Sequence, residues 1–282
     1  MLIDYHTHHA RCGHAVGTLE EYIRRGIQIG LSQIGVSDHM PLLHVNPQTY
    51  YPEMAMPMEE LPNYVEEAFE LKQKYASSIS VRVGLEADYI EGWENEIAKI
   101  INDYPWDYVI GSVHFLGEWD VSDFRQVHHW EGRDIFEVYQ TYYDAVQKAA
   151  KTGFYDIMGH LDVIKRFNYK PEGHQSEIVE LEQKTLTAIA EAGIAMELNA
   201  SGLTKPCAEM FPSNTILQAA IELGIPLTVG SDAHDPKKLS ENLDIARNTL
   251  CKLGVRELAT FEQRQRVMVP LQLKNGHNNV RQ

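Results

Sequence analysis

Residues 2–8 read Leu2-Ile3-Asp4-Tyr5-His6-Thr7-His8, a short apolar run that ends in two histidines. Six further short runs along the chain are rich in β-branched and apolar residues. Most of them are apolar at consecutive rather than alternate positions, which is typical of strands buried on both faces of a parallel sheet. The seven predicted strands are Leu2–Tyr5, Gln33–Ser37, Ser80–Glu86, Tyr108–Val113, Tyr155–Gly159, Ile194–Leu198 and Pro226–Gly230.

Helical patterns separate these strands. Thr18 and Glu21 have the spacing of a capping box at the start of the first helix. Six more helices are predicted at Leu61–Tyr75, Glu94–Asn102, Asp134–Thr152, Ser176–Ala192, Ser213–Leu223 and Ser240–Leu253. The alternation of strands and helices predicts a parallel α/β fold. Because no linker rich in Pro, Gly or Ser interrupts the seven repeats, we expect one barrel domain over residues 1–270 and a flexible polar tail over 271–282.

The composition is that of an ordinary globular protein, with 44% hydrophobic and 23% charged residues among 282 and a formal net charge of −15. This acidity argues against nucleic acids and anionic membranes as partners, because both require basic surfaces. The N-terminus lacks the features of a signal peptide, and no apolar run approaches the ~20 residues of a membrane helix. Three widely spaced cysteines, Cys12, Cys207 and Cys251, favour the reducing cytoplasm.

Side chains that can bind a metal follow every predicted strand. A lone histidine in such a place is more often structural, but seven such positions would share one rim of the barrel. That rim, at the C-terminal ends of the strands, is where (β/α) barrels hold their active sites. The side chains, in strand order, are His6, His8 and His14; Asp38 and His39; Glu86; His114; His160; Glu197 and Asn199; and Asp232 and His234.

The spacing within His6-Thr7-His8 supports a metal centre. Residues i and i+2 share one face of a strand, so both imidazoles can hold one ion. Asp232-Ala233-His234 repeats this spacing after the last strand, which would neighbour the first in a closed barrel. Imidazole and carboxylate are the ligands of zinc, iron and manganese.

These segments resemble four motifs of the polymerase and histidinol phosphatase (PHP) superfamily. The resemblance extends over about residues 2 to 270. Three further segments, Gly84 to Tyr89, Gly111 to Leu116 and Gly159 to Asp162, are similar to its histidinol-phosphate phosphatase branch. The four motifs are Asp4-Tyr5-His6-Thr7-His8, Ser37-Asp38-His39, the histidine of Gly111-Ser112-Val113-His114-Phe115, and Gly230-Ser231-Asp232-Ala233-His234.

The resemblance implies a distorted (β/α)7 barrel with three divalent ions, zinc, iron or manganese, on nine protein ligands. His6, His8, Glu86 and Asp232 would hold one ion. A second would share Glu86 and add His114 and His160, and a third would lie among His14, His39 and His234. The implied activity is hydrolysis of L-histidinol phosphate to L-histidinol and phosphate, in histidine biosynthesis.

Such hydrolysis needs a nucleophile, charge neutralisation and positioning. Two ions can bridge a hydroxide that attacks phosphorus, and a third can neutralise phosphoryl oxygens. No serine or cysteine nucleophile is then required, and Cys12 is read as incidental. Asp232 or His234 could protonate the leaving alkoxide through a bound water.

Residues near the ligands have several candidate roles. Asp38, Glu197 and Asn199 could orient ligating histidines, although the last two could equally serve barrel-core hydrogen bonding. Arg166 is the first candidate for binding phosphate, because its planar guanidinium fits phosphate bidentately, and Arg11 is the second. Lys165 could simply face solvent. For the imidazole and amine of the substrate the candidates Glu118, Asp88 and Trp130 stay open.

Two long predicted loops, Met40–Glu60 and Phe115–Arg133, could act as lids or be plain surface. Another PHP phosphoesterase is the nearest alternative in function. Amidohydrolases also begin with two histidines on the first strand, but their bridging lysine has no counterpart here. A non-catalytic metal-binding barrel predicts missing ligands, and none of the nine is missing.

Overall fold

Seven parallel strands in the order β1-β2-β3-β4-β7-β8-β9 form the central sheet of the computed structural model, which describes residues 1–45 and 52–273. Each strand lies where the apolar runs predict one. Their side chains are buried almost throughout, as expected for a sheet covered on both faces. The bounds are β1 Ile3–Asp4, β2 Gln33–Val36, β3 Ser80–Asp88, β4 Tyr108–Ser112, β7 Ile157–Met158, β8 Ala195–Asn199 and β9 Leu227–Gly230.

The sheet curves into a nearly closed barrel because its first and last strands meet. The backbone N–H of Tyr5 donates to the carbonyl of Val229 at 3.1 Å, and that of Asp232 donates to His6 at 2.9 Å. A parallel bridge between Thr7 and Ala233 extends this contact. The predicted seven-stranded α/β barrel is therefore confirmed.

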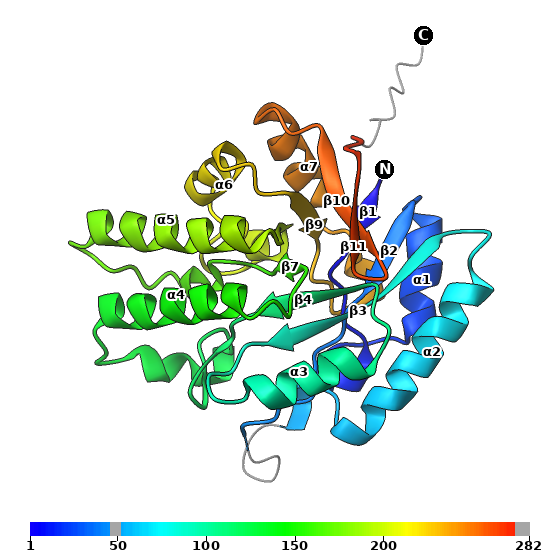
Figure 1. The fold of residues 1–282 in the computed structure, drawn as a ribbon, viewed down its shortest axis with the longest axis horizontal. Coiled ribbons are helices and arrows are strands. Elements are labelled where there is room, and N and C mark those ends of the chain that lie inside the picture. The colour runs from blue at the N-terminus through cyan, green and yellow to red at the C-terminus, as the bar shows by residue number, and fades with distance from the viewer. Residues whose placement is uncertain (46–51, 274–282) are drawn as a thin grey trace.

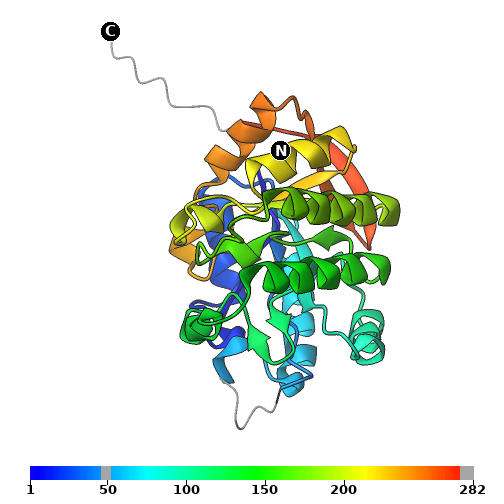
Figure 2. The same cartoon turned by 90° about the vertical axis from the view of Figure 1, so that its left-hand side faces the viewer.

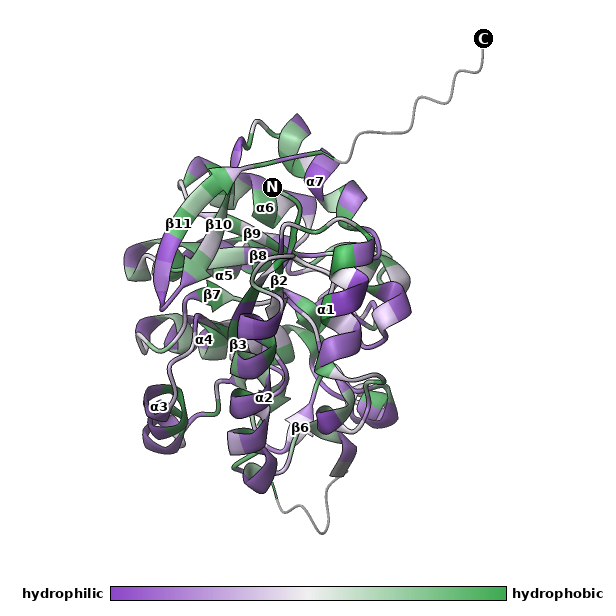
Figure 3. Cartoon of the chain, turned by 90° about the vertical axis from the view of Figure 1, so that its right-hand side faces the viewer, coloured by the Kyte–Doolittle hydropathy of each residue, from purple (hydrophilic) through white to green (hydrophobic). Residues whose placement is uncertain are grey.

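Helices surround the strands (Figure 1). Their apolar sides face the barrel and their hydrophilic sides face outward (Figure 3). Thr18 and Glu21 form the predicted capping box at the start of the first helix. Helices α4 and α5 lie side by side across one face (Figure 2). The bounds are α1 Leu19–Gln28, α2 Leu61–Lys74, α3 Glu94–Asp103, α4 Ile135–Lys151, α5 Gln175–Ala192, α6 Asn214–Glu222 and α7 Leu243–Lys252.

The interior near the N-terminal ends of the strands is filled by aromatic rings. Tyr108 donates its hydroxyl to the carbonyl of Tyr5 at 2.7 Å, and the two rings lie 4.8 Å apart. A Cβ atom at Gly84 would lie 2.4 Å from the Tyr108 ring, and one at Gly35 would lie 2.0 Å from its hydroxyl. Two strands thus require glycine so that one large tyrosine can fit inside the barrel.

A C-terminal hairpin, β10 (Glu257–Glu262) and β11 (Gln265–Pro270), was not predicted from the sequence. It covers the N-terminal end of the barrel: Phe261 packs against Tyr5, and Arg264 donates its backbone N–H to Asp107, just before β4. The turn residues Gln263 and Arg264 both have positive φ without being glycine or asparagine, so the usual hairpin signal is missing. Figure 1 shows the hairpin beside the N-terminus.

The two long loops follow β2 and β4, at the opposite end of the barrel. The second contains a small hairpin, β5 (Phe115–Leu116) and β6 (Trp119–Asp120), and a 3-10 helix at Phe124–Trp130. Part of the first loop, residues 46–51, lies outside the described residues, as does most of the predicted tail, 274–282. Within the described part, no helix combines the length and apolarity needed to cross a bilayer.

Candidate metal centre and active site

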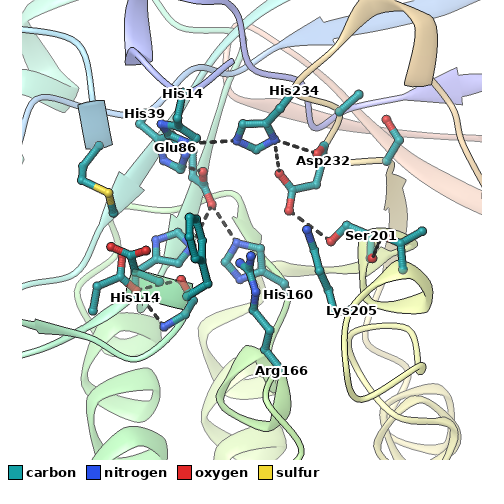
Figure 4. A pocket seen from close by; sticks show the side chains of 18 of the residues that line it. His14, His39, Glu86, His114, His160, Arg166, Ser201, Lys205, Asp232 and His234 are labelled. Carbon is teal, nitrogen blue, oxygen red and sulfur yellow. Dashed lines mark hydrogen bonds and ion pairs between the residues drawn. The ribbon is translucent and has the colours of Figure 1, made fainter. Parts of the chain in front are cut away.

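A cavity of about 440 Å³ opens at the C-terminal ends of the strands. Seven of the nine predicted ligands line it, and the other two, His6 and His8, are fully buried beneath them. Figure 4 shows the labelled imidazoles and carboxylates pointing toward one another across this cavity. The structure thus gathers side chains that are more than 200 residues apart in sequence.

Glu86, at 1% exposure near the end of β3, lies at the centre of the cluster. Its carboxylate has two sides, and each faces a different set of histidines. Oε1 lies 2.8 Å from His160 Nε2 and 3.8 Å from His114 Nε2. Oε2 faces the other set, with distances of 3.3 Å to His6 Nε2, 3.4 Å to His8 Nε2 and 2.9 Å to His39 Nδ1. A carboxylate in this position can bridge two ions.

Asp232 supplies the second carboxylate of the cluster. Its Oδ1 lies 3.2 Å from His8 Nε2 and 3.9 Å from His6 Nε2, and the three residues form one set that can hold an ion. Its backbone has φ 53°, in the left-handed region that a non-glycine residue rarely adopts. Such local strain is typical of residues held in place for function.

The third predicted set, His14, His39 and His234, lies at the mouth of the cavity. His14 Nε2 is 3.0 Å from His234 Nε2, but the ring of His14 is 5.2 Å from that of His39. His39 instead groups with His8 and His234, and separately with Glu86 and His114. The described residues therefore form overlapping sets, in which His39 joins the deep part of the cluster to its mouth.

The hydrogen bonds of the deepest histidines fit a metal ligand. His6 and His8 each have a buried Nε2 atom without a hydrogen-bond partner among the described residues. The other nitrogen of each ring is occupied: Nδ1 of His6 lies 2.8 Å from Glu197, and Nδ1 of His8 lies 3.4 Å from Asp38. A carboxylate that accepts from Nδ1–H leaves the Nε2 lone pair free for an ion, so these residues fit the implied metal.

The protonation of these histidines depends on their neighbours. Burial favours the neutral ring of His8, but Asp232, Asp38 and Glu86 outweigh it and raise its pKa to about 9. Burial also favours the neutral ring of His114, but the charges of Asp88 and Glu86 outweigh it and raise the pKa of His114 to about 10. Burial and two neighbouring histidines, His39 and His8, lower the pKa of His14 to about 4. In the metal-free cluster, protons therefore occupy positions that divalent ions would take.

Glu197 and Asn199 contribute to the cluster from β8. Glu197 Oε1 contacts the His6 ring, and its Oε2 accepts from the backbone N–H of His160 at 2.9 Å. Asn199 donates to that same Oε2 at 3.1 Å. A Cβ atom at Gly230 would lie 2.0 Å from Glu197 Oε1, so the next strand must carry glycine there. Glu197 and Asn199 therefore form hydrogen bonds in the barrel core and also support the histidine cluster.

Sequence reasoning missed the supporting roles of two residues, Asp4 and His9. Asp4 accepts hydrogen bonds from Ser231 and Ser240, which ties the first strand to the segment after β9. His9 pairs through Nδ1 with Asp38, on the carboxylate oxygen that His8 does not contact. The only sequence signal for these roles is that both residues are polar and lie within or beside the first histidine motif. Their hydrogen-bond partners lie far along the chain, so the spacing of residues could not identify them.

The cations near the cavity differ from one another in their contacts. Arg166 and Lys205 line the cavity, and neither has an ion-pair partner among the described residues. Burial and the charge of Arg166 lower the pKa of Lys205. Lys205 lies after β8 and carries no motif, so the sequence did not point to it. Arg11 lies outside the cavity lining and pairs with Glu60 and Glu67.

Other expected side chains have different places. Lys165 does not face solvent: its Nζ lies 2.8 Å from Asp162 and donates to the carbonyl of Met210 at 2.9 Å. Trp130 is 1% exposed and stacks on Tyr169, away from the cavity lining. Glu118 is exposed and does not line the cavity. Both long loops do contribute lining residues, namely Leu42 and Met54 from the first and Phe115, Asp120, Ser122, Asp123, Phe124 and Arg125 from the second.

Comparison with known proteins agrees with this architecture. A profile of the PHP domain matches residues 4–201 of the chain. The chain belongs to the PHP domain family. Within the family it is 38% identical to the probable histidinol-phosphatase of Deinococcus radiodurans, over 94% of this chain and 98% of that protein. It is 33% identical to the histidinol-phosphatase of Bacillus subtilis, over 82% of this chain and 92% of that protein.

A solved structure of this PHP branch has the same fold. The histidinol phosphate phosphatase of Lactococcus lactis, complexed with zinc, L-histidinol and phosphate, matches with a TM-score of 0.79 at 26% identity. The match covers 94% of this chain and 98% of that protein. The predicted resemblance to the histidinol-phosphatase branch of the PHP family is thus confirmed.

Proposed function

We propose that this PHP protein is a histidinol-phosphatase that hydrolyses L-histidinol phosphate to L-histidinol and phosphate, in the histidine biosynthesis of the cytoplasm. One observation carries the proposal. A buried carboxylate, Glu86, contacts five histidines at the floor of a cavity whose wall carries three cations without an ion-pair partner among the described residues, Arg166, Lys205 and Lys238. Such a cavity combines metal ligands with anion-binding groups, which phosphomonoester hydrolysis requires.

The nine predicted ligands would hold three divalent ions of zinc, iron or manganese. Bound ions would supply Lewis acidity and lower the pKa of a bound water toward neutrality. The chain's own residues hold the ligands still: Glu197 fixes the ring of His6, Asp38 fixes that of His8, and Asp88 fixes that of His114 at 2.9 Å. Residues 1–270 would form this single catalytic domain.

Arg166 and Lys205 would bind the phosphoryl oxygens. Arg166 offers a planar fork of donors, and Lys205 offers an ammonium that burial keeps poorly solvated. Arg11 has no part in this proposal, because Glu60 and Glu67 already neutralise it. Asp232 or His234 would pass a proton to the leaving alkoxide through water. Ser201 donates to Asp232 Oδ2 at 3.2 Å, which orients this carboxylate at the cavity wall.

The test is to purify the protein without chelator, measure its metal content, and compare phosphate release from histidinol phosphate and from an aryl phosphate. We expect a preference of at least about 100-fold in kcat/KM for histidinol phosphate. Equal, slow rates on both substrates would instead favour a general phosphoesterase. Absence of turnover with full metal loading would support a metal-binding barrel without catalysis.

A further inference from the structure

Three buried carboxylates line the cavity without serving as predicted metal ligands, and one of them, Asp123, is paired with Arg125. Asp88 is 4% exposed and Asp120 is 3% exposed. Both act on His114, since the charge of Asp88 raises the pKa of that histidine and the charge of Asp120 does the same. In Figure 4, His114 and Lys205 lie at opposite sides of the pocket. The cavity is therefore acidic beside His114 and basic beside Arg166 and Lys205.

The two carboxylates differ in the groups they already bind. Asp88 Oδ1 accepts from the backbone N–H of His114 at 3.1 Å and lies 2.9 Å from its Nδ1, so it positions this ligand. Asp120 Oδ1 accepts from the backbone N–H and the hydroxyl of Ser122, at 2.7 and 2.8 Å. Asp120 Oδ2 has no hydrogen-bond partner among the described residues. This oxygen is thus free to receive a donor from the cavity.

Among the described residues, no lysine or arginine forms an ion pair with Asp120, and the charge of His114 acts on it only at longer range. Arg125, on the same loop, binds Asp123 through Nε at 3.0 and 3.1 Å. Burial of this carboxylate is costly and raises the pKa of Asp120, because the interior solvates charge poorly. Any ligand that brings an ammonium group to Asp120 removes this cost, and a ligand without one does not.

We propose that Asp120 determines specificity by binding the protonated amine of the substrate's leaving group. The inference rests on the proposed function and names the class of substrate: phosphomonoesters of short amino alcohols, with the amine close to the ester oxygen. The phosphate would face Arg166 and Lys205 while the ammonium faces Asp120. The two ends of the cavity then select molecules that carry both charges.

The test compares histidinol phosphate with its analogue that lacks the amine, 3-(imidazol-4-yl)propyl phosphate, on the wild-type metalloprotein and the Asp120→Asn variant. Asparagine keeps an oxygen to accept from Ser122 but loses the charge. We expect Asp120→Asn to reduce the ratio of the two kcat/KM values by about 10- to 100-fold, the range for a hydrogen bond to a charged group. Glu118→Gln, the same change on an exposed acid of the same loop, should leave the ratio as in wild type.

A binding measurement gives a second readout. Calorimetric titration of the wild-type metalloprotein should show tighter binding of L-histidinol than of 3-(imidazol-4-yl)propanol, and this difference should vanish in Asp120→Asn. An unchanged ratio and an unchanged binding difference in a folded, metal-loaded variant would overturn the role of Asp120. If the wild-type protein itself fails to prefer histidinol phosphate over an aryl phosphate, the proposed function fails instead.

Discussion

Arg166 and Lys205 are candidates for binding phosphate because they have no ion-pair partner among the described residues. Lys165, beside Arg166 in the chain, is neutralised by Asp162, whereas Arg166 and Lys205 have no ion-pair partner in the described part of the chain. Burial and the charge of Arg166 lower the pKa of Lys205, and the charge of Asp232 opposes this only in part. A bound phosphate would relieve both effects.

Arg166→Ala and Lys205→Ala should therefore each raise KM for histidinol phosphate by about 10- to 100-fold, since hydrogen bonds to charged groups contribute about 1.5–3 kcal/mol each. The metal content should stay at the wild-type level, because neither residue belongs to a candidate ligand set. Steady-state kinetics and elemental analysis check both statements. Lys184→Ala, on the exposed face of α5, is the matched control. Wild-type KM values in both variants would contradict phosphate binding at this wall.

At the scale of a single element, β9 shows how a strand end can support a neighbouring ligand. Its last residue, Gly230, leaves room for the Glu197 carboxylate that fixes the ring of His6. Any side chain at position 230 would meet both Glu197 Oε1, at 2.0 Å, and His6 Cβ, at 2.5 Å. Both neighbours are buried at or below 1% exposure and cannot move aside freely.

Gly230→Ala should displace Glu197 from His6 and weaken metal binding by about 10- to 100-fold, the usual effect of losing a residue that orients a ligand. Competition with a chelator, followed by elemental analysis, measures this loss. Gly254→Ala is the matched control: φ is 88° in open space after α7, so this change strains the backbone away from the cluster. Lower stability with full metal binding is expected there. Equal metal affinity in both variants would refute the role of Gly230.

For the whole molecule, the formal charge of −15 does not describe the cavity. The nine predicted ligands include only two carboxylates, and divalent ions would bring positive charge that a residue count omits. An acidic chain can thus bind an anionic substrate, and the two observations do not conflict. The same ions should also dominate stability, because a group that binds only the folded state stabilises it by mass action.

The metal-free protein should lose stability as the pH rises from about 7 to 10. His8 and His114 have folded-state pKa values of about 9 and about 10, raised above the ordinary 6.5 by acidic neighbours that outweigh burial. Their protonated forms therefore stabilise the fold fully below pH 6.5, and this contribution disappears as the pH passes through 9 and 10. Bound metal ions would replace these protons, so the loaded protein should not show the same decline.

Thermal unfolding with and without chelator, from pH 6.5 to 10, measures this difference. The gap in Tm between the loaded and the chelated protein should widen with pH. The chelated His114→Gln variant should show a smaller decline, because it lacks one of the histidines whose pKa is raised. Parallel curves for the loaded and chelated protein over this range would rule out the proposed exchange of protons for metal.

Much of the barrel could be read from the chain. Consecutive apolar residues locate all seven strands, because a strand covered on both faces has no polar side to show. The Thr18–Glu21 spacing locates a helix start, because capping is a local interaction. The hairpin β10–β11 escaped detection because Gln263 and Arg264 adopt a left-handed turn that their residue types do not favour. Packing of Phe261 on Tyr5 supplies what the turn sequence lacks.

The clustering of the candidate ligands could be predicted for a related reason. Strand ends of a parallel barrel share one rim, so His6, Glu86 and Asp232 had to come close once their strands were recognised. Distances, counter-ions and burial did not follow from order along the chain. The structure places Arg166 and Lys205 in the cavity wall, whereas Arg11 lies elsewhere and pairs with Glu60. Asp88 contacts His114, whereas Asp120 Oδ2 has no hydrogen-bond partner among the described residues. These differences could not be predicted because the side-chain contacts join residues that are distant in sequence, and local sequence patterns do not determine such contacts.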